Sequence, residues 1–74
     1  MAKTIGFLGG GNMATGIIGG LIDRKSYEPK NIFVREINKD RAAWLKKQFG
    51  LSIVESNEEL AGKTDLIVFA VKPQ

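Results

Sequence analysis

The sequence predicts an α/β fold with a parallel sheet, in the element order β-α-β-α-β-α-β. Four short apolar runs alternate with segments that carry helical spacing or polar residues, and short buried runs of this kind are typical of parallel strands. Each intervening segment is long enough to cross back over one face of a sheet, as right-handed crossovers require. With 74 residues, 43% of them hydrophobic and 26% charged, the chain has the size and composition of one globular domain.

The first half of the chain supplies two strands and one helix. Lys3–Leu8 is short and apolar and stops at a glycine, which favours a buried strand, although Gly6 weakens it. Within Asn12–Lys25 apolar residues recur every three or four positions, so we expect an amphipathic helix there. The polar, proline-containing segment 26–31 predicts a loop, and Ile32–Val34 predicts a second short strand.

The next part of the chain predicts a helix, a strand and a short helix. Lys39–Phe49 carries apolar residues on one helical face, among them Trp44, and Gly50 follows where a C-terminal glycine belongs. Leu51–Glu55 predicts a brief third strand. Segment 56–64 holds one or two helical turns, since the serine or asparagine at its start can accept from the free amides of the first turn.

The last apolar run, Asp65–Pro73, predicts the fourth strand. Its uninterrupted apolar core Leu66–Val71 contains no charge, so we expect the most deeply buried strand of the sheet here. Doubly wound sheets of this kind carry further strands on the far side of the first strand. We therefore expect strand order 3-2-1-4 and a chain that is part of a longer protein.

Composition and charge narrow the possible function classes. The formal net charge of +3 comes from 11 Lys and Arg and 8 Asp and Glu spread along the chain, which gives little support to nucleic-acid binding. The lack of cysteine and histidine removes thiol nucleophiles, imidazole bases and the usual zinc ligands. The N-terminal apolar stretch matches neither a signal peptide nor a membrane span. We expect a cytoplasmic protein with no metal, membrane or nucleic-acid partner.

The junction of the first strand and the first helix reads "GGGNMA" at positions 9–14, which is the pattern G-x-G-x-x-A of a Rossmann-like fold. Gly9 allows the sharp turn out of the strand, Gly11 lets the backbone approach a pyrophosphate, and Ala14 lets the helix pack close to the strand. The free amides of the helix N-terminus favour an anion. Gly10 is the least constrained residue of the run. This position predicts a dinucleotide-binding loop.

Two other interpretations of the glycines compete with this one. Three glycines can form a flexible turn, and a phosphate loop of a nucleoside triphosphatase needs a Lys-Ser or Lys-Thr pair that is absent here. Gly16, Gly19 and Gly20 lie within the predicted helix, where a glycine costs about 1 kcal/mol relative to alanine. We expect these three to mark a close approach of the helix to the sheet.

The end of the second strand carries the residues expected to select the cofactor. A carboxylate at Glu36 would accept hydrogen bonds from a ribose diol and favour NAD, whereas Arg35, with Asn38 and Lys39 nearby, could hold a 2′-phosphate and favour NADP. The competing interpretation is a solvated loop with a weak Arg-Glu or Glu-Lys pair. Both cofactors therefore stay open.

The end of the chain lies at the same edge of the predicted sheet. Ligands of open parallel sheets bind outside the carboxyl ends of the strands, so Ala70, Val71 and Lys72 should flank the cofactor. Pro73 can also act as a strand terminator with no functional role.

With these residues placed, the sequence closely resembles the N-terminal cofactor domain of the pyrroline-5-carboxylate reductase family. The matching pieces are "IGFLGGGNMA" at Ile5–Ala14, "IIGGLI" at Ile17–Ile22 and "AVKPQ" at Ala70–Gln74. The resemblance covers all 74 residues but only about the first quarter of a typical family member. It implies that residues 1–74 are a dinucleotide-binding domain, and that a C-terminal helical domain would form the dimer and bind the cyclic imine acid.

The resemblance also implies roles for particular residues. Asn57 would lie near the adenosine ribose. The residues around the pyrophosphate would be Gly9, Gly11, Asn12, Met13 and Ala14, and those beside the nicotinamide would be Ala70, Val71 and Lys72. The family commonly prefers NADPH and often has a small hydroxyl or amide residue at the end of the second strand. Glu36 departs from this pattern and would repel a 2′-phosphate unless Arg35 or Lys39 compensates.

The implied reaction is hydride transfer from a nicotinamide cofactor to a C=N bond, which makes proline. None of the 74 residues is a convincing proton donor, so we expect this chain alone to bind cofactor weakly and not to turn over. The rival enzymes are a reductase similar to coenzyme F420-dependent NADP oxidoreductases and a competence-associated reductase. The rival from another class is a non-catalytic nucleotide-binding module.

Overall fold

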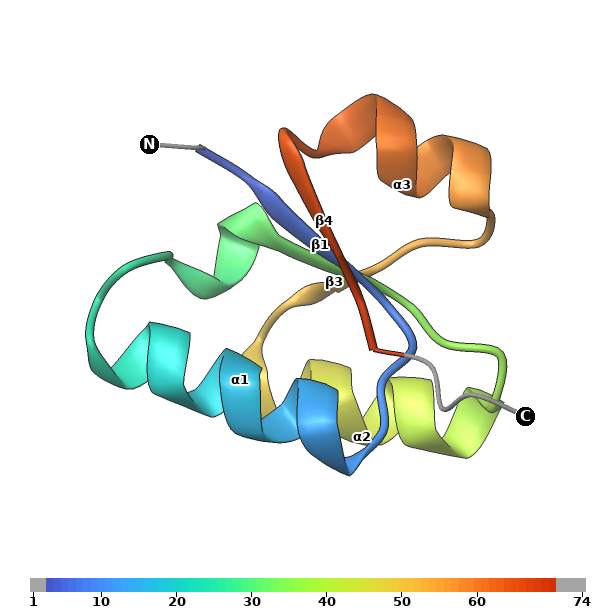
Figure 1. Cartoon of the computed structure of the whole chain (residues 1–74). Helices are drawn as coiled ribbons and strands as arrows, with labels where there is room; N and C mark the ends of the chain where they lie inside the picture. Colours follow the sequence, from blue (N-terminus) through green and yellow to red (C-terminus); the bar gives the residue numbers. More distant parts are fainter. Residues whose placement is uncertain (1–2, 71–74) are drawn as a thin grey trace.

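The computed structural model describes residues 3–70, which form one parallel sheet of four strands with helices on both faces (Figure 1). The strand order is β3-β2-β1-β4. Helices α1 and α2 lie along one face of the sheet, and α3 lies on the other (Figure 1). The predicted α/β class, the parallel pairing and the order 3-2-1-4 are confirmed.

The elements follow the predicted order, most of them with shorter bounds, while the second strand is one residue longer than predicted. They are β1 Ile5–Leu8, α1 Asn12–Asp23, β2 Ile32–Arg35, α2 Lys39–Phe49, β3 Ser52–Ile53, α3 Asn57–Lys63 and β4 Leu66–Phe69. The second helix has the predicted bounds, whereas the third strand keeps only two of its five predicted residues. A short 3-10 helix at Pro29–Asn31 replaces part of the expected loop. No helix within residues 3–70 is long and apolar enough to cross a membrane.

The ends of α2 are fixed by the residues that the pattern predicts for helix ends. The Asn38 side chain accepts a hydrogen bond from the Arg41 N–H at 2.9 Å and so caps the first turn. At the other end Gly50 adopts the left-handed conformation, with φ of 76°, and its N–H donates to the Lys46 carbonyl at 2.8 Å. Glycine adopts this conformation without steric cost, which explains why α2 ends at Phe49.

A reciprocal pair of hydrogen bonds begins α3. The Ser56 hydroxyl accepts from the Glu59 N–H at 3.1 Å, and the Glu59 carboxylate accepts from the Glu55 N–H at 2.9 Å. This backbone hydrogen bond, together with the ion pair to Lys63, lowers the pKa of the exposed Glu59 carboxyl. Ser56 is the cap, so Asn57 is the first helical residue and its side chain is left for other contacts.

The main core lies between the sheet and the α1–α2 layer. Alternate residues of β1 and β2 point into it, as the two-residue period of a strand requires. Phe7, Ile18, Val34 and Leu45 are among its fully buried members. Phe7 and Val34 come from neighbouring strands, while Ile18 and Leu45 come from α1 and α2. This packing sets α1 and α2 side by side, which is important for the loop described below.

The prediction that the fourth strand is the most buried one is wrong. Leu66 is 48% exposed and Phe69 is 70% exposed. The physical reason is position: within residues 3–70, β4 pairs with β1 alone and forms the edge of the sheet. Among residues 3–70, α3 packs over β1 and β2 and leaves the face of β4 opposite α1 uncovered. An apolar run alone does not distinguish a central strand from an edge strand.

The prediction for the glycines of the first helix is also wrong. A Cβ built at Gly16 or Gly20 meets no atom within 4 Å, and one at Gly19 meets Phe49 at 4.0 Å. The close approach occurs instead at Gly6 of β1. A Cβ there would lie 2.7 Å from Leu60 Cδ1 of α3. The glycine that weakened the strand prediction is therefore the residue that lets α3 pack onto the sheet.

Candidate functional site

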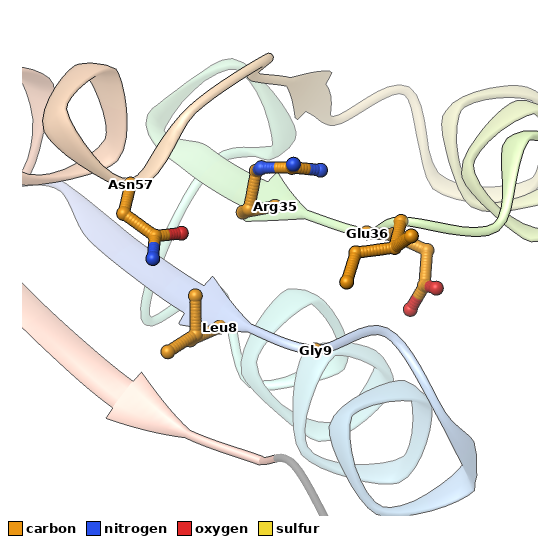
Figure 2. Close-up of a pocket in the computed structure, with 6 residues that line it drawn as sticks. Leu8, Gly9, Arg35, Glu36 and Asn57 are labelled. Atoms are coloured by element: carbon orange, nitrogen blue, oxygen red, sulfur yellow. The ribbon is translucent and has the colours of Figure 1, made fainter.

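A cavity of about 320 Å³ lies at the carboxyl ends of β1 and β2, beside the N-terminus of α3 (Figure 2). Leu8 and Arg35 are paired neighbours at the ends of these two strands. Among the described residues, the lining consists of Leu8, Gly9, Arg35, Glu36, Ile37 and Asn57. This is the edge of a parallel sheet where ligands bind. Four predicted site residues, Gly9, Arg35, Glu36 and Asn57, are therefore brought together.

Gly9 makes the sharp turn that the glycine pattern predicts. Its φ is 103°, a value that residues with a side chain rarely adopt. Its N–H donates to the carbonyl of Arg35, the last residue of β2, at 3.0 Å, so the pairing with β2 continues one residue beyond β1 before the chain turns. A substitution at Gly9 would strain the backbone at the mouth of the cavity.

Gly11 caps α1 and borders open space. A Cβ built on it meets no atom within 4 Å, which is the condition for a ligand to approach the backbone there. Asn12 and Met13 follow as the first helical residues, and Met13 is 58% exposed. Ala14 is fully buried against the core, as the pattern predicts. Contact of these residues with a dinucleotide stays a prediction.

Gly10, which the pattern left least constrained, is closely surrounded by side chains of the second β-α unit. A Cβ at this position would lie 2.5 Å from Leu45 Cδ1 and 3.0 Å from Glu36 Oε1. Its N–H donates to Glu36 Oε1 at 2.7 Å. The second β-α unit therefore packs directly against the middle of the glycine loop, and that contact excludes a side chain.

The Glu36 carboxylate is engaged by the backbone on both of its oxygens. Oε1 accepts from the Gly10 N–H at 2.7 Å, and Oε2 accepts from the Asn38 N–H at 2.9 Å. Figure 2 shows this carboxylate turned toward the chain that follows Gly9. Within residues 3–70 Glu36 forms no ion pair with Arg35 or Lys39. Of the interpretations that the sequence left open, the solvated Arg-Glu or Glu-Lys pair is therefore wrong.

Besides Glu36, the cavity is bordered by the polar residues Arg35 and Asn57. Figure 2 shows Asn57 above the end of β1 and Arg35 extended over the end of β2. Arg35 is half-buried and, within the described part of the chain, has no carboxylate partner. A second cavity of about 410 Å³ also includes Arg35, and Lys39 lines this second cavity instead of the first. Among residues 3–70, Arg35 is thus the cation that lines the first cavity.

Arg41 and Thr15 are site residues that the sequence patterns missed. Arg41 Nε donates to the Gly10 carbonyl at 2.7 Å, and Arg41 Nη2 donates to Thr15 Oγ1 at 2.6 Å. The guanidinium also lies over the Trp44 ring, 4.6 Å from its centroid. The spacing of Arg41 and Trp44 on one helix was visible in the sequence. The contact with Gly10, 31 residues away, depends on the packing of α2 beside the loop and has no local signal.

Trp44 differs from its predicted place in the helix packing. It is 42% exposed, and its ring meets Phe49 edge to face at a centroid distance of 6.1 Å. Its main polar contact is the cation of Arg41, an arrangement worth roughly 0.5–1 kcal/mol at an exposed site. Trp44 thus supports the arginine that bonds the glycine loop.

The predicted residues at the end of the chain are described only in part. Ala70 is buried, and its N–H donates to the Leu8 carbonyl at 2.9 Å, which extends the pairing of β4 with β1 by one residue. Val71 and Lys72 lie outside the described residues. Ala70 therefore adjoins the end of β1, at the edge where the cavity opens, while the predicted role of all three beside a nicotinamide is not tested.

Comparisons with known proteins relate the chain to reductases. Residues 4–74 match the protein family described as NADP oxidoreductase, coenzyme F420-dependent. The chain is 45% identical over 73 residues to the pyrroline-5-carboxylate reductase of Escherichia coli (strain K12), an alignment that covers 99% of the chain and 27% of that protein.

Two solved structures have the same fold over nearly the whole chain. A pyrroline-5-carboxylate reductase from Coxiella burnetii superposes with a TM-score of 0.85 at 38% identity, covering 96% of this chain and 26% of that one. The pyrroline carboxylate reductase of Plasmodium falciparum, solved with NADP bound, gives a TM-score of 0.75 at 32% identity, covering 93% and 24%. The chain thus spans about a quarter of the length of these relatives. It belongs to the coenzyme F420-dependent NADP oxidoreductase family and is homologous to the N-terminal portion of pyrroline-5-carboxylate reductases.

Proposed function

We propose that the chain binds NADP(H) and is the cofactor-binding domain of a reductase that converts 1-pyrroline-5-carboxylate to proline. The observation that carries the proposal is the open space over Gly11 at the N-terminus of α1, beside the cavity at the ends of β1 and β2. A helix N-terminus next to a glycine without neighbours suits a pyrophosphate. The similarity to a structure with NADP bound supports the same assignment.

In the proposed reaction, the cofactor, this chain and the rest of the protein each have a different role. A reduced nicotinamide supplies the hydride for the imine carbon, and a proton from solvent or another group completes the amine. The residues of this chain bind and orient the dinucleotide, which places the reacting atoms at productive distance. We assign the pocket for the cyclic imine acid and the dimer contacts to the part of the relatives that this chain does not span.

The structure favours NADP over NAD through Arg35. The Glu36 carboxylate already accepts two backbone N–H groups, so a ribose diol would compete with the hydrogen bonds that hold the glycine loop. Arg35 lines the cavity without a carboxylate partner among residues 3–70, and a guanidinium binds phosphate through paired hydrogen bonds. We therefore assign the adenosine 2′-phosphate to Arg35.

Replacing Arg35 should change cofactor preference. In the full-length protein that carries this chain, Arg35→Ser is expected to raise the KM for NADPH by about 10-fold to 100-fold, the worth of one charge-assisted hydrogen bond to phosphate. The KM for NADH should change less than about 2-fold, because NADH lacks the 2′-phosphate. The matched control is Lys39→Gln, which removes a nearby cation that lines the second cavity. A loss of preference in Lys39→Gln and not in Arg35→Ser would contradict the assignment.

The activity itself is tested with the full-length protein. Purified protein is mixed with 1-pyrroline-5-carboxylate and either NADPH or NADH, and the decrease in nicotinamide absorbance is followed. We expect oxidation that depends on the imine acid. Because the family description names coenzyme F420, a parallel assay offers reduced F420 with NADP. Turnover only in the F420 assay would show that the imine acid is not the substrate. Cofactor binding without turnover in either assay would indicate a non-catalytic nucleotide-binding module.

A further inference from the structure

Both polar backbone groups of Gly10 are bonded to charged side chains of the second β-α unit. Its N–H donates to Glu36 Oε1 at 2.7 Å, and its carbonyl accepts from Arg41 Nε at 2.7 Å. Both side chains are partly buried at these contacts, so water competes with the hydrogen bonds less than at an open surface. The directions of the Gly10 N–H and carbonyl are therefore fixed, the first by Glu36 at the end of β2 and the second by Arg41 of α2.

The direction of the Gly10 carbonyl determines where the next amide points. The peptide bonds of the described residues are trans, and in a planar trans peptide the C=O and the following N–H point in opposite directions. Because Arg41 holds the Gly10 carbonyl toward α2, the Gly11 N–H points away from α2. Within residues 3–70 this N–H donates no hydrogen bond.

Thr15 fixes the next peptide in the same way. The Gly11 carbonyl accepts from the Thr15 hydroxyl and from the Thr15 N–H, both at 2.9 Å. The same hydroxyl accepts from Arg41 Nη2, so the arginine also orients it. As a result the Asn12 N–H turns outward from α1, and it too donates no hydrogen bond within the described part of the chain. Two adjacent amides are thus presented beside the open space over Gly11.

We propose that Arg41 is a positioning residue that orients the Gly11 and Asn12 amides to bind the pyrophosphate of a dinucleotide. The inference rests on the proposed function, since it assumes that a dinucleotide binds at this loop. Arg41 acts through the Gly10 carbonyl and the Thr15 hydroxyl, two acceptors that a planar guanidinium can satisfy together and a lysine ammonium cannot hold in one fixed geometry. The Trp44 ring packs against the guanidinium, whose carbon lies 4.6 Å from the ring centroid.

The test separates the pyrophosphate from the rest of the cofactor. Titration calorimetry on the full-length protein measures the Kd of NADPH and of adenosine 2′-phosphate, a probe that lacks the pyrophosphate. Arg41→Met should weaken NADPH by about 10-fold or more, the worth of one misdirected amide-phosphate hydrogen bond. Adenosine 2′-phosphate should change by less than about 2-fold. Arg41→Lys keeps the charge but should restore NADPH affinity only in part. The control is Lys47→Met, an exposed change on the same helix, which should leave both Kd values unchanged.

A second variant tests the positioning role in case Arg41→Met does not fold. Thr15→Val keeps the shape of the side chain and removes the hydroxyl, so NADPH alone should weaken, by a few fold. Equal weakening of NADPH and adenosine 2′-phosphate in Arg41→Met, or no change in either, would overturn the positioning role. If the unmodified protein bound neither ligand, the proposed function itself would fail, which is a different result from a variant that behaves like the unmodified protein.

Discussion

Gly6→Val is expected to lower the free energy of unfolding of the 74-residue chain by about 3 kcal/mol or more. A Cβ at this position would lie 2.7 Å from Leu60 Cδ1 and 2.9 Å from Thr64 Cγ2, and valine adds two further carbons. Leu60 is 1% exposed, so its side chain can make room only by displacing the atoms packed around it. The preference of valine for strands acts in the opposite direction but spans only about 1 kcal/mol. Steric overpacking therefore determines the sign.

The size of the effect is large relative to the total stability. A chain of this length has roughly 4–11 kcal/mol of unfolding free energy. The variant should also lose its site, because displacement of α3 moves Asn57 away from the cavity. Urea denaturation followed by circular dichroism measures the change. The matched control is Gly62→Ala in α3, where a Cβ meets no atom within 4 Å, and it should stabilise the chain by up to about 1 kcal/mol. Equal stability of Gly6→Val and the native chain would show that α3 does not pack as described.

The adjacent substitutions Gly10→Ala and Gly11→Ala are expected to fail in different ways. Gly11→Ala places a methyl group in open space, so the fold should lose at most about 1 kcal/mol through the poorer helix cap. The methyl group would stand between the backbone and a pyrophosphate, and NADPH affinity should fall by about 10-fold to 100-fold. Gly10→Ala instead drives its methyl group into Leu45 and should cost about 1–3 kcal/mol of stability.

The comparison of the two variants is informative because each serves as the control of the other. Urea denaturation gives the stability of each, and calorimetric titration with NADPH gives its affinity. We expect Gly11→Ala to be a stable protein that binds poorly and Gly10→Ala to be less stable before any ligand is added. A Gly11→Ala variant with unchanged affinity would place the pyrophosphate elsewhere. A Gly10→Ala variant of native stability would contradict the contact with Leu45.

Features that depend on neighbouring residues in the chain were predictable from the sequence. The left-handed Gly50 and the bounds of α2 follow from local helix signals, and the turn at Gly9 follows from its place between a strand and a helix. The strand order follows from the β-α alternation together with the usual strand arrangement of doubly wound sheets. These elements were correct because their causes lie within a few residues or in general topological rules.

Features that depend on which surfaces meet in three dimensions were not predictable. The sequence shows that Leu66–Phe69 is apolar but not that it forms the edge of the described sheet. It shows glycines in α1, while the close contact occurs at Gly6 with a helix more than fifty residues later. The bonds that Arg41 and Glu36 make with Gly10 likewise depend on the placement of α2 beside the loop. Contacts between segments far apart in the chain decide which strand is the edge and which glycine is closely packed, and local patterns do not contain this information.

Arg35 and Glu36, neighbours at the end of β2, have different structural roles, and we expect this difference to affect how the two positions evolve. The Glu36 carboxylate bonds the backbone of the glycine loop and of its own loop, whereas Arg35 faces the cavity without such a bond. Position 35 is therefore free to vary when selection favours a different ligand, while a change at position 36 leaves the Gly10 N–H without its acceptor. Among natural homologues, residues 10, 36 and 41 should covary as a group, and residue 35 should diversify independently of them.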